Sequence, residues 1–307
     1  MPKITLKDLR KEVETVLKKK NVDDAKKFFK AHFKNTDDEL WGLVKPRNFE
    51  DKVFYAAIYR DVKNVGYSTL RDDCAEWLNV GNKTFQHNQR EVRSILMKWG
   101  KSKIKRGNSL EWIKKARNQK FPKSVEDTNL FWDSADFGMA KKKGQGRKSP
   151  WWSHKQNTLG RRFMMICDCT KKIRYLDGPY SPKLFDGDWI KAKKKMLKKY
   201  YKGVVICGDT HFRRAISEHK NDNSFPKCYA PFVNNKKKTE DGTKKTVLTK
   251  QQQQHNSDIS SIRGRAEMPF ADFGKKFLCL KQKFREDEKE LEKVVYIAAG
   301  FHNMSCK

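Results

Sequence analysis

The sequence lacks any long hydrophobic run. No stretch approaches the ~18 consecutive apolar residues that a membrane-spanning helix needs, so we expect no transmembrane span. The opening stretch MPKITLKDLRKEVETVLKKK also lacks the apolar core of a signal peptide and has the pattern of an amphipathic helix.

Cysteine is scarce and scattered. The chain has 7 Cys, and only Cys167 and Cys169 lie close together. An odd number without regular spacing fits a reducing compartment rather than a disulfide framework. Because no second cluster with zinc spacing accompanies the CDC segment, we interpret its two thiols as strand packing.

Two phosphate-binding motifs are missing as well. No Gly-x-Gly-x-x-Gly follows a strand, and no Gly-x-x-x-x-Gly-Lys-Ser/Thr occurs. The first absence argues against a dinucleotide-binding domain, and the second leaves ATP hydrolysis unsupported.

Acidic residues are too few to balance the basic ones. Lys and Arg total 69 against 37 Asp and Glu, which gives a formal net charge of +32. The excess is densest at 140–148, 191–202 and 234–245. A positive field of this size attracts a polyanion and releases its counterions, so nucleic acid is the expected partner. The basic runs lack the apolar face of a membrane-surface helix, so we expect no membrane partner.

The residues that are present suffice for a folded core. The chain has 307 residues, 37% of them hydrophobic and 12% aromatic, enough for two domains. Apolar residues recur at intervals of three and four through residues 1–62, which predicts helices. We therefore expect a helical DNA-binding region over residues 1–120.

Residues 67–100 have the pattern of a helix-turn-helix. An apolar helical face around Trp77 is followed by the turn NVGNKT and by a second apolar stripe. An ordinary helical hairpin would show the same pattern. If the second helix enters the major groove, the residues that face DNA are Lys83, Thr84, Gln86, His87, Gln89 and Arg90.

Beyond a connector at 118–129 the periodicity changes. Short apolar or alternating runs predict five strands: NLFWDSADFGM, RRFMMICDC, KIRYLDGPY, GVVICGD and KCYAPFV. DWIKAKKKMLKKYY predicts a helix between the third and fourth strands, and the C-terminal part is helical again, with a kink or break expected at Pro269. The fold class is therefore α/β with a mixed sheet, and we expect a basic loop at about 233–256.

The strand VVIC runs into Gly208 and Asp209, and this carboxylate has two interpretations. Asp is a common helix N-cap, and THFRRAISEH could be the helix that it caps. Alternatively, Asp209 acts together with Asp133, in the first strand, and Glu267, on a late helix. Three acids in these positions converge in ribonuclease-H-like folds. Carboxylates gathered at one point raise one another's pKa, and two divalent cations such as Mg²⁺ relieve the repulsion.

Four blocks of the chain resemble the DDE superfamily endonucleases, specifically the Harbinger-type transposases. The likeness is carried by FWDSADFGM with Asp133, CGDTHF with Asp209, RGRAEMPFADFGKKFLCLKQKF with Arg263 and Glu267, and GFHNM with His302 and Asn303. The helix-turn-helix region is also similar to that family's N-terminal portion. The resemblance implies a ribonuclease-H-like DDE nuclease domain over residues 121–307.

The resemblance also implies roles for single residues. Asp133, Asp209 and Glu267 would hold two Mg²⁺ ions, for which Mn²⁺ can substitute. Asp136 competes with Asp133, but strand alternation puts the two on opposite faces, and Asp133 is the one that aligns with the family. Asp186, in SPKLFDGDW, could help to hold metal or substrate, or could be a helix N-cap. The remaining candidates, as phosphate-binding or supporting residues, are Lys155, Arg263 and His302.

The function implied by the resemblance is metal-dependent cutting of DNA at transposon ends, followed by joining of the 3′-OH to target DNA. One alternative is a domesticated DNA-binding protein that no longer cuts, and another is a resolvase or an RNA-cleaving nuclease on the same fold. The family further implies double-stranded DNA as substrate, a nuclear location and a separate Myb-like DNA-binding partner protein, and it leaves a homo-oligomer open.

Overall fold

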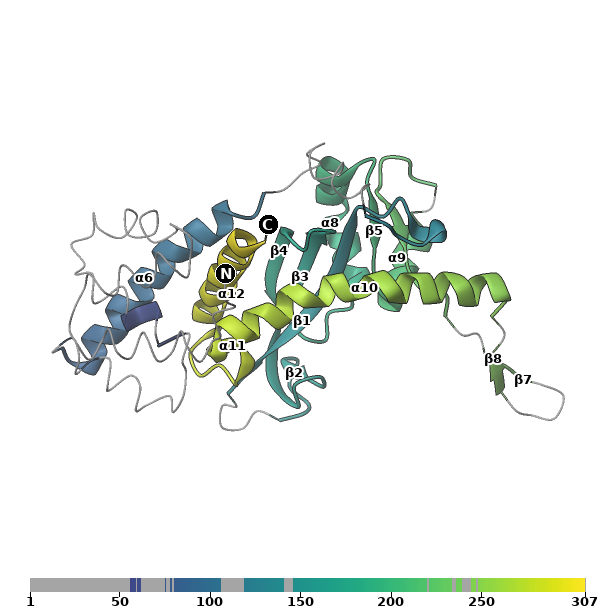
Figure 1. The fold of residues 1–307 in the computed structure, drawn as a ribbon. Helices are drawn as coiled ribbons and strands as arrows, with labels where there is room; N and C mark the ends of the chain where they lie inside the picture. The colour runs from purple at the N-terminus through teal and green to yellow at the C-terminus, as the bar shows by residue number, and fades with distance from the viewer. Residues whose placement is uncertain are drawn as a thin grey trace. The chain divides into compact units, whose positions relative to one another are not determined.

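A computed structural model of the chain describes residues 80–105, 119–140, 146–219, 221–233, 236–238, 244–246 and 248–306, together with residues 56–58, 60, 61, 75 and 78. The chain divides into two compact units, and Figure 1 labels its helices and strands. Unit 1 comprises residues 1–104, 136–161 and 271–307, and unit 2 comprises residues 105–135 and 162–270.

Most of the predicted N-terminal helices lie outside the described residues. This applies to residues 1–55 and to most of the first helix of the predicted helix-turn-helix, whereas residues 56–58, 60 and 61 are helical. Its second helix is present as α6 (Asn82–Ser102). No helix in the described ranges is long and apolar enough to cross a membrane.

Unit 1 is organised around α6 and the C-terminal helix α12 (Glu288–Ser305), which pack against each other. Two glycines permit the close approach. A Cβ atom on Gly100 would lie 2.2 Å from the carbonyl oxygen of Tyr296, and one on Gly300 would lie 2.8 Å from the Cα of Gly100. A side chain at either position would therefore force the two helices apart.

A buried ionic cluster fixes the inward face of α6. Arg93 is 2% exposed and forms ion pairs with Asp61, with Glu286 (2.8 Å) and with Glu290 (3.1 Å). Gln89, one turn earlier, donates from Nε2 to Asp61 Oδ1 at 3.2 Å. Removing one partner of a buried ion pair is strongly destabilising, because the other charge stays buried. This cluster thus determines which residues of α6 remain at the surface.

The other elements of unit 1 are short. Strand β2 (Trp152–Ser153) pairs in antiparallel fashion with the start of β3, and α11 (Leu278–Lys281) precedes α12. Met139, at the end of β1, forms a parallel bridge with Phe284.

Unit 2 contains the centre of the sheet, and all five predicted strands are present. They are β1 (Leu130–Met139), β3 (Thr158–Asp168), β4 (Ile173–Tyr180), β5 (Val205–Cys207) and β6 (Lys227–Tyr229). The strand order is β2-β3-β1-β5-β6, with β4 also paired to β3. Strand β5 is parallel to both β1 and β6, whereas β3 and β4 are antiparallel. The predicted mixed α/β architecture is confirmed.

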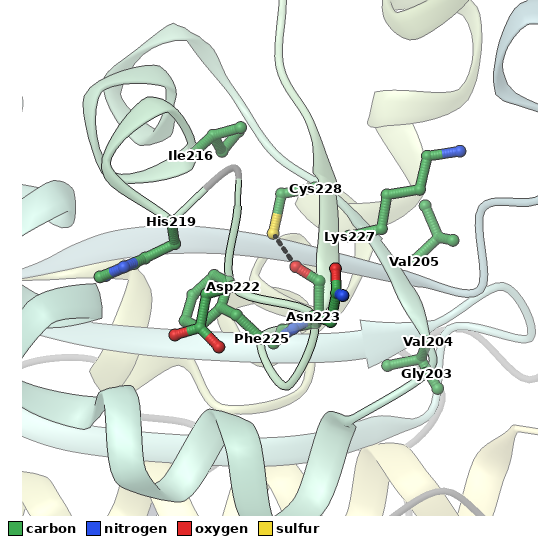
Figure 2. A pocket seen from close by; sticks show the side chains of 11 residues that line it. Gly203, Val204, Val205, Ile216, His219, Asp222, Asn223, Phe225, Lys227 and Cys228 are labelled. Carbon is green, nitrogen blue, oxygen red and sulfur yellow. Dashed lines mark hydrogen bonds between the residues drawn. The ribbon is translucent and has the colours of Figure 1, made fainter.

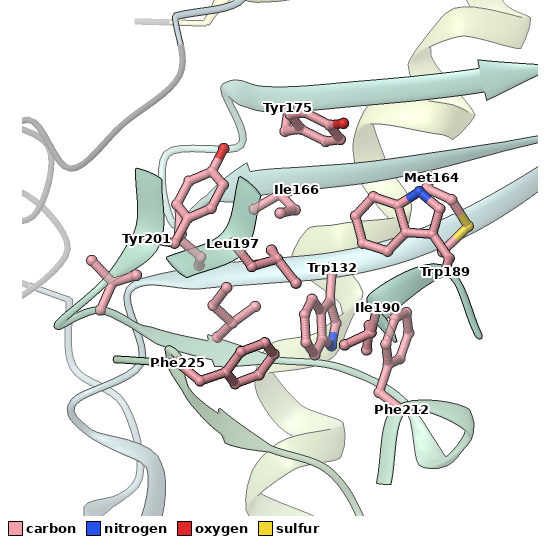
Figure 3. Packing of buried hydrophobic residues seen from close by; sticks show 13 residues of the cluster. Trp132, Met164, Ile166, Tyr175, Trp189, Ile190, Leu197, Tyr201, Phe212 and Phe225 are labelled. Atoms are coloured by element: carbon pink, nitrogen blue, oxygen red, sulfur yellow. The ribbon is translucent and has the colours of Figure 1, made fainter. Parts of the chain in front are cut away.

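Side chains of helix α8 (Asp186–Tyr201) pack on one face of this sheet (Figure 3). The buried residues that β1, β3 and β5 contribute to the cluster are even-numbered and so share a face by the period of two of a strand, as Trp132 and Ile166 do. The residues that α8 adds are Trp189, Ile190, Leu197 and Tyr201. This cluster is the hydrophobic core of unit 2.

Helix α10 (Lys250–Lys276) lies against the opposite face (Figure 1). The Cys167 thiol donates to the Arg265 carbonyl at 3.8 Å, and the Arg265 guanidinium donates to the Cys169 carbonyl at 2.8 Å. Both cysteines are buried, in agreement with their interpretation as strand packing. The remaining short helices of unit 2 are η2 (Lys123–Val125), η3 (Thr210–Phe212) and α9 (Arg213–Glu218).

The prediction of a loop over 233–256 is wrong in two respects. The segment contains an antiparallel strand pair, β7 (Lys236–Lys238) and β8 (Lys244–Thr246), and α10 already begins at Lys250. A capping box starts the helix: Thr249 Oγ1 accepts from the Gln252 N–H at 3.2 Å, and Gln252 Oε1 accepts from the Thr249 N–H at 3.1 Å. The glutamines are therefore helical.

Pro269 does not end α10, so of the kink or break predicted there, the break is wrong. Proline lacks an N–H, so the carbonyl four residues earlier, that of Arg265, loses its helical donor. The Cys167 thiol of β3 supplies a donor to this carbonyl. A side chain of the neighbouring sheet thus compensates for the lost hydrogen bond, and the helix continues to Lys276.

The compact units are not continuous in sequence, whereas the predicted domains meet at one boundary near residue 120. Unit 1 gathers N-terminal and C-terminal segments because α12 packs on α6. A pairing between segments so far apart in sequence cannot be predicted from local composition.

Candidate active site

Asp133 lies in β1, and Asp209 follows β5, the parallel neighbour of β1. Strands β1 and β5 are parallel neighbours, with Phe131 opposite Cys207. Continuing this register by two residues on each strand places Asp209 beside Asp133, and Asp209 keeps an extended backbone (φ −82°, ψ −177°). Because side chains alternate along a strand, both carboxylates share the face of Cys207, the face against which α10 lies.

The residue between β5 and Asp209 must be glycine. A Cβ atom on Gly208 would lie 1.8 Å from Nε1 of Trp132 and 2.8 Å from the ring of Phe212. These two rings stack with their centroids 4.6 Å apart. Because Gly208 has no side chain, the backbone can pass close to the Trp132 indole, and Asp209 follows directly after this position.

The N-cap interpretation of Asp209 is confirmed for one of its oxygens. Asp209 is the N-cap of η3, and its Oδ1 accepts the N–H of His211 at 2.8 Å. A cap occupies a single oxygen of the carboxylate. It also fixes the side-chain orientation, so capping and a second role for Asp209 are compatible.

Helix α10 contributes Arg263 and Glu267, which lie one turn apart. Nη2 of Arg263 donates to Oε1 of Glu267 at 2.9 Å. This hydrogen bond is the main reason why the pKa of Arg263 lies above its ordinary value; burial opposes it, and the negative charges of Asp209 and Asp133 add to it. The negative charges of all three carboxylates, which come from distant blocks of sequence, therefore act on one guanidinium.

Asp186 is a fourth acidic residue of this region, and it is not a helix cap. The N-cap of α8 is Phe185, and no side chain caps the helix. Asp186 is 4% exposed; its Oδ2 accepts from Ser134 Oγ at 3.5 Å, and its Oδ1 lies 3.6 Å from Nη1 of Arg162. Burial raises the pKa of Asp186, Arg162 opposes this, and the nearby charge of Asp209 raises it further. Arg162 has no counterpart among the residues identified from sequence, because no motif surrounds it.

The donor set suits a hard divalent cation. Asp133, Asp209 and Glu267 offer carboxylate oxygens, which Mg²⁺ prefers. In the described part of the chain, however, no three His, Cys, Asp or Glu side chains are arranged to hold one ion together. Glu267 is 57% exposed, and an ion pair of this kind along a helix is worth only about 0.5 kcal/mol. Glu267 can therefore leave Arg263 at little cost.

The alternative first acid, Asp136, has a different environment. It is buried, and Oγ of Ser153 donates to its Oδ2 at 2.7 Å. The Nε2 of Gln156 donates to its backbone carbonyl at 2.9 Å. Asp136 belongs to unit 1, whereas Asp133, Asp209 and Glu267 all belong to unit 2.

Two further predicted residues, Lys155 and His302, belong to unit 1. Lys155 is exposed in the turn between β2 and β3. His302 is buried, and its Nδ1 lies 2.9 Å from Oδ2 of Asp272. This pairing lies within unit 1, whereas Asp133, Asp209 and Glu267 belong to unit 2.

On α6, one of the residues predicted to face DNA is in fact buried. Gln89 is 1% exposed, accepts from Arg60 and donates to Asp61, so its assignment to a DNA contact is wrong. The burial of Gln89 could not be predicted from its polar amide, because burial depends on the residues that surround the side chain in the folded chain. The others are half-buried, as is Gln86, or exposed: Lys83, Thr84, His87 and Arg90.

Comparison with protein families matches residues 133–303 to the DDE superfamily endonuclease family. The match begins at Asp133 and includes Asp186, Asp209 and Glu267. The same comparisons find no similar curated protein and no similar solved structure. The matched segment is more than half of the chain, and the mixed α/β sheet is compatible with a nuclease of this kind. The chain therefore belongs to the DDE superfamily endonucleases.

Proposed function

We propose that the chain is a metal-dependent endonuclease and transposase of the Harbinger type. Asp133, Asp209 and Glu267 would hold two divalent cations, Mg²⁺ or Mn²⁺. When bound, such cations supply an activated water or 3′-OH and stabilise the leaving oxygen in phosphodiester cleavage. The observation that carries the proposal is the parallel pairing of β1 with β5, because Asp133 lies in one strand and Asp209 follows the other, both within the segment that matches the family.

Arg263 and Asp186 would support the same reaction. A guanidinium binds phosphate through two parallel hydrogen bonds, so a DNA phosphate can replace Glu267 as the partner of Arg263. The exchange would free Glu267 to join the other carboxylates. Asp186, held between Ser134 and Arg162, would supply a further buried negative charge next to Asp209.

DNA ends and target would be bound by the basic surface. Lys83, Thr84, His87 and Arg90 recur along the exposed side of α6, as residues of a recognition helix do. The net charge of +32 supplies the affinity for double-stranded DNA that does not depend on sequence. A nuclear location, a Myb-like DNA-binding partner and a homo-oligomer belong to this proposal through the resemblance to Harbinger-type transposases.

A second candidate is a DNA-binding protein that has kept the fold but no longer cuts. The observation that favours it is the Arg263 guanidinium among the carboxylates, together with the lack of a three-ligand cluster among the described residues. In this case DNA would bind, and divalent cations would have no effect on its integrity.

The test is cleavage of duplex DNA by the purified chain with Mg²⁺ or Mn²⁺, compared with Asp209→Asn. The asparagine can still accept the His211 N–H, so the cap is kept and only the charge is removed. We expect the wild type to cut and the variant to lose activity about a hundredfold or more, because a cation ligand is missing.

A matched control for Glu267 lies on the same helix. Glu267→Gln should lose activity like Asp209→Asn, whereas Asp258→Asn, which removes a carboxylate that hydrogen-bonds Ser124, should cut normally. Undiminished cutting by Asp209→Asn would remove this residue from the mechanism. A wild type that binds DNA but cuts none with either cation would favour the silent DNA-binding protein.

A further inference from the structure

A cavity of about 890 Å³ opens in unit 2, away from the residues of the acidic site. Its walls come from β6, the segment that follows β6, α9 and the first turns of α10. Its lining includes three rings, two amides and one guanidinium: Tyr229, Phe232, His255, Gln251, Gln252 and Arg213. The volume is in the usual range for small-molecule sites, ~300–1,000 Å³.

Three rings form one wall of this cavity. The centroid of the His255 ring lies 5.3 Å from that of Phe232 and 5.7 Å from that of Tyr229, at interplanar angles of 67° and 74°. The guanidinium carbon of Arg213 lies 4.1 Å from the centroid of Phe232. Burial lowers the pKa of His255, partly offset by Asp258, so the imidazole is neutral at pH 7. The wall is therefore aromatic, with the His255 ring set edge-to-face against the other two rings, and one cation flanks it.

The wall is also preorganised. Asn256 holds the backbone of Phe232 from both sides: its Oδ1 accepts the Phe232 N–H at 2.7 Å, and its Nδ2 donates to the Phe232 carbonyl at 3.0 Å. Arg213 donates from Nη1 to the Pro231 carbonyl at 3.0 Å, which fixes the guanidinium beside the ring. A ligand would therefore need to order few side chains on binding, and the low entropic cost favours affinity.

The chain between Phe232 and Thr249, two residues that line the cavity, contains the lysine-rich hairpin of β7 and β8. Strand β7 starts four residues after Phe232, and Thr249 follows β8 by three residues, so the hairpin ends lie within ~14 Å and ~11 Å of the cavity walls. Five of the six residues in β7 and β8 are lysines, and the register sets Lys237 opposite Lys245 and Lys238 opposite Lys244. So many lysines close together in sequence make this segment strongly positive, and a polyanion would offset that charge.

A second cavity of unit 2 differs in charge (Figure 2). It has a volume of about 460 Å³ and shares Ile216 and Cys228 with the first. Its wall carries the carboxylate of Asp222, which is paired with Lys194 and Lys198. None of the residues described as lining the larger cavity is acidic, so only that cavity suits a ligand attached to phosphates.

We propose that the larger cavity, which we call the base pocket, receives one unpaired base of DNA. The base would stack on Phe232 and Tyr229, with Gln251 and Gln252 near its polar edge and the adjoining phosphates on Arg213 and the lysine hairpin. A paired base within a duplex has both faces covered by its neighbours, so only an unpaired base can offer a face to these rings. This inference rests on the DNA-binding part of the proposed function and is independent of cleavage.

The test compares two labelled duplexes of equal length, one fully paired and one with a single unpaired 2-aminopurine, by fluorescence anisotropy in EDTA with the full chain. We expect the duplex with the unpaired base to bind about tenfold more tightly, and the 2-aminopurine emission to be quenched by stacking. Phe232→Leu keeps an apolar side chain of similar size but removes the ring, so it should abolish both effects. Phe232→Tyr should keep them.

A variant of the hairpin separates charge from stacking. Lys237→Gln combined with Lys245→Gln should weaken binding of both duplexes by a similar factor and leave their ratio unchanged. Equal affinity of the wild type for the two duplexes, or an unchanged preference in Phe232→Leu, would overturn the proposal. Asp209→Asn should keep the preference, so a failure of the base pocket and a failure of the nuclease proposal give different results.

Discussion

At the scale of single residues, the acidic site depends on a position that has no side chain. Gly208→Ala would place a methyl group against the indole of Trp132, at 1.8 Å from Nε1. We expect a loss of about 1–3 kcal/mol in the free energy of unfolding, as is usual for overpacking, measured by urea denaturation.

Gly264→Ala is the matched control for this substitution. Gly264 lies within α10, and a Cβ atom there would meet nothing within 4 Å. Alanine is the better helix former by about 0.5–1 kcal/mol, so this variant should be more stable than the wild type. If both variants changed stability in the same direction, the steric explanation of Gly208 would be wrong.

A second residue-scale prediction concerns Asp272 and acid stability. Burial raises the pKa of this carboxyl, but hydrogen bonding to His302 and the charge of Lys276 lower it more, to about 2. Because the folded pKa lies below the unfolded value of ~3.9, the stabilisation is complete above that value and is lost as the pH falls toward 2. Solvent screening reduces the effect to about 1 kcal/mol.

The measurement is the free energy of unfolding of wild type and Asp272→Asn at pH 5, 4, 3 and 2. Other carboxylates titrate in both proteins, so the difference between the two is informative. This difference should shrink by about 1 kcal/mol between pH 5 and pH 2. A difference that does not depend on pH would show that the pairing with His302 and Lys276 contributes no charge stabilisation.

At the scale of elements, α10 passes through Pro269 because β3 offers a donor. Pro269→Ala restores the N–H and relieves the clash of the proline ring, and we expect a gain of about 1–3 kcal/mol in the free energy of unfolding. The Arg265 carbonyl then has a helical donor of its own and no longer depends on the Cys167 thiol.

A double-mutant cycle tests this coupling between helix and strand. Cys167→Ala leaves the same cavity in both backgrounds, so the cavity cancels from the comparison. The substitution should cost about 0.5–1 kcal/mol more in the presence of Pro269 than in its absence, because only then is the Arg265 carbonyl left unpaired. An equal cost in both backgrounds would rule out the compensating role of the thiol.

At the scale of the whole molecule, charge should dominate the affinity for DNA. A formal net charge of +32 implies many phosphate contacts, each of which releases a counterion. With about six contacts, the association constant should fall roughly a thousandfold between 50 and 200 mM salt. Fluorescence anisotropy of a fully paired duplex at several salt concentrations measures the slope, and a slope near zero would contradict a polyanion-binding surface.

Local sequence patterns were enough to predict most elements of this protein and its chemical class. Alternating apolar runs predicted all five strands of unit 2, and the excess of Lys and Arg predicted a polyanionic partner. The three acidic blocks led to the DDE superfamily, to which the chain belongs. These properties can be predicted from the sequence because each depends on residues close together in the chain or on total composition.

Tertiary structure decided which side chains meet. The parallel pairing of β1 with β5 brought the sequence blocks of Asp133 and Asp209 together, and the charges of both residues act on Arg263 of α10. The burial of Gln89 and the passage of α10 through Pro269 likewise depend on partners far away in sequence. A periodic pattern defines the faces of a helix or strand, but the neighbour of each face follows from long-range packing, so only the folded chain determines it.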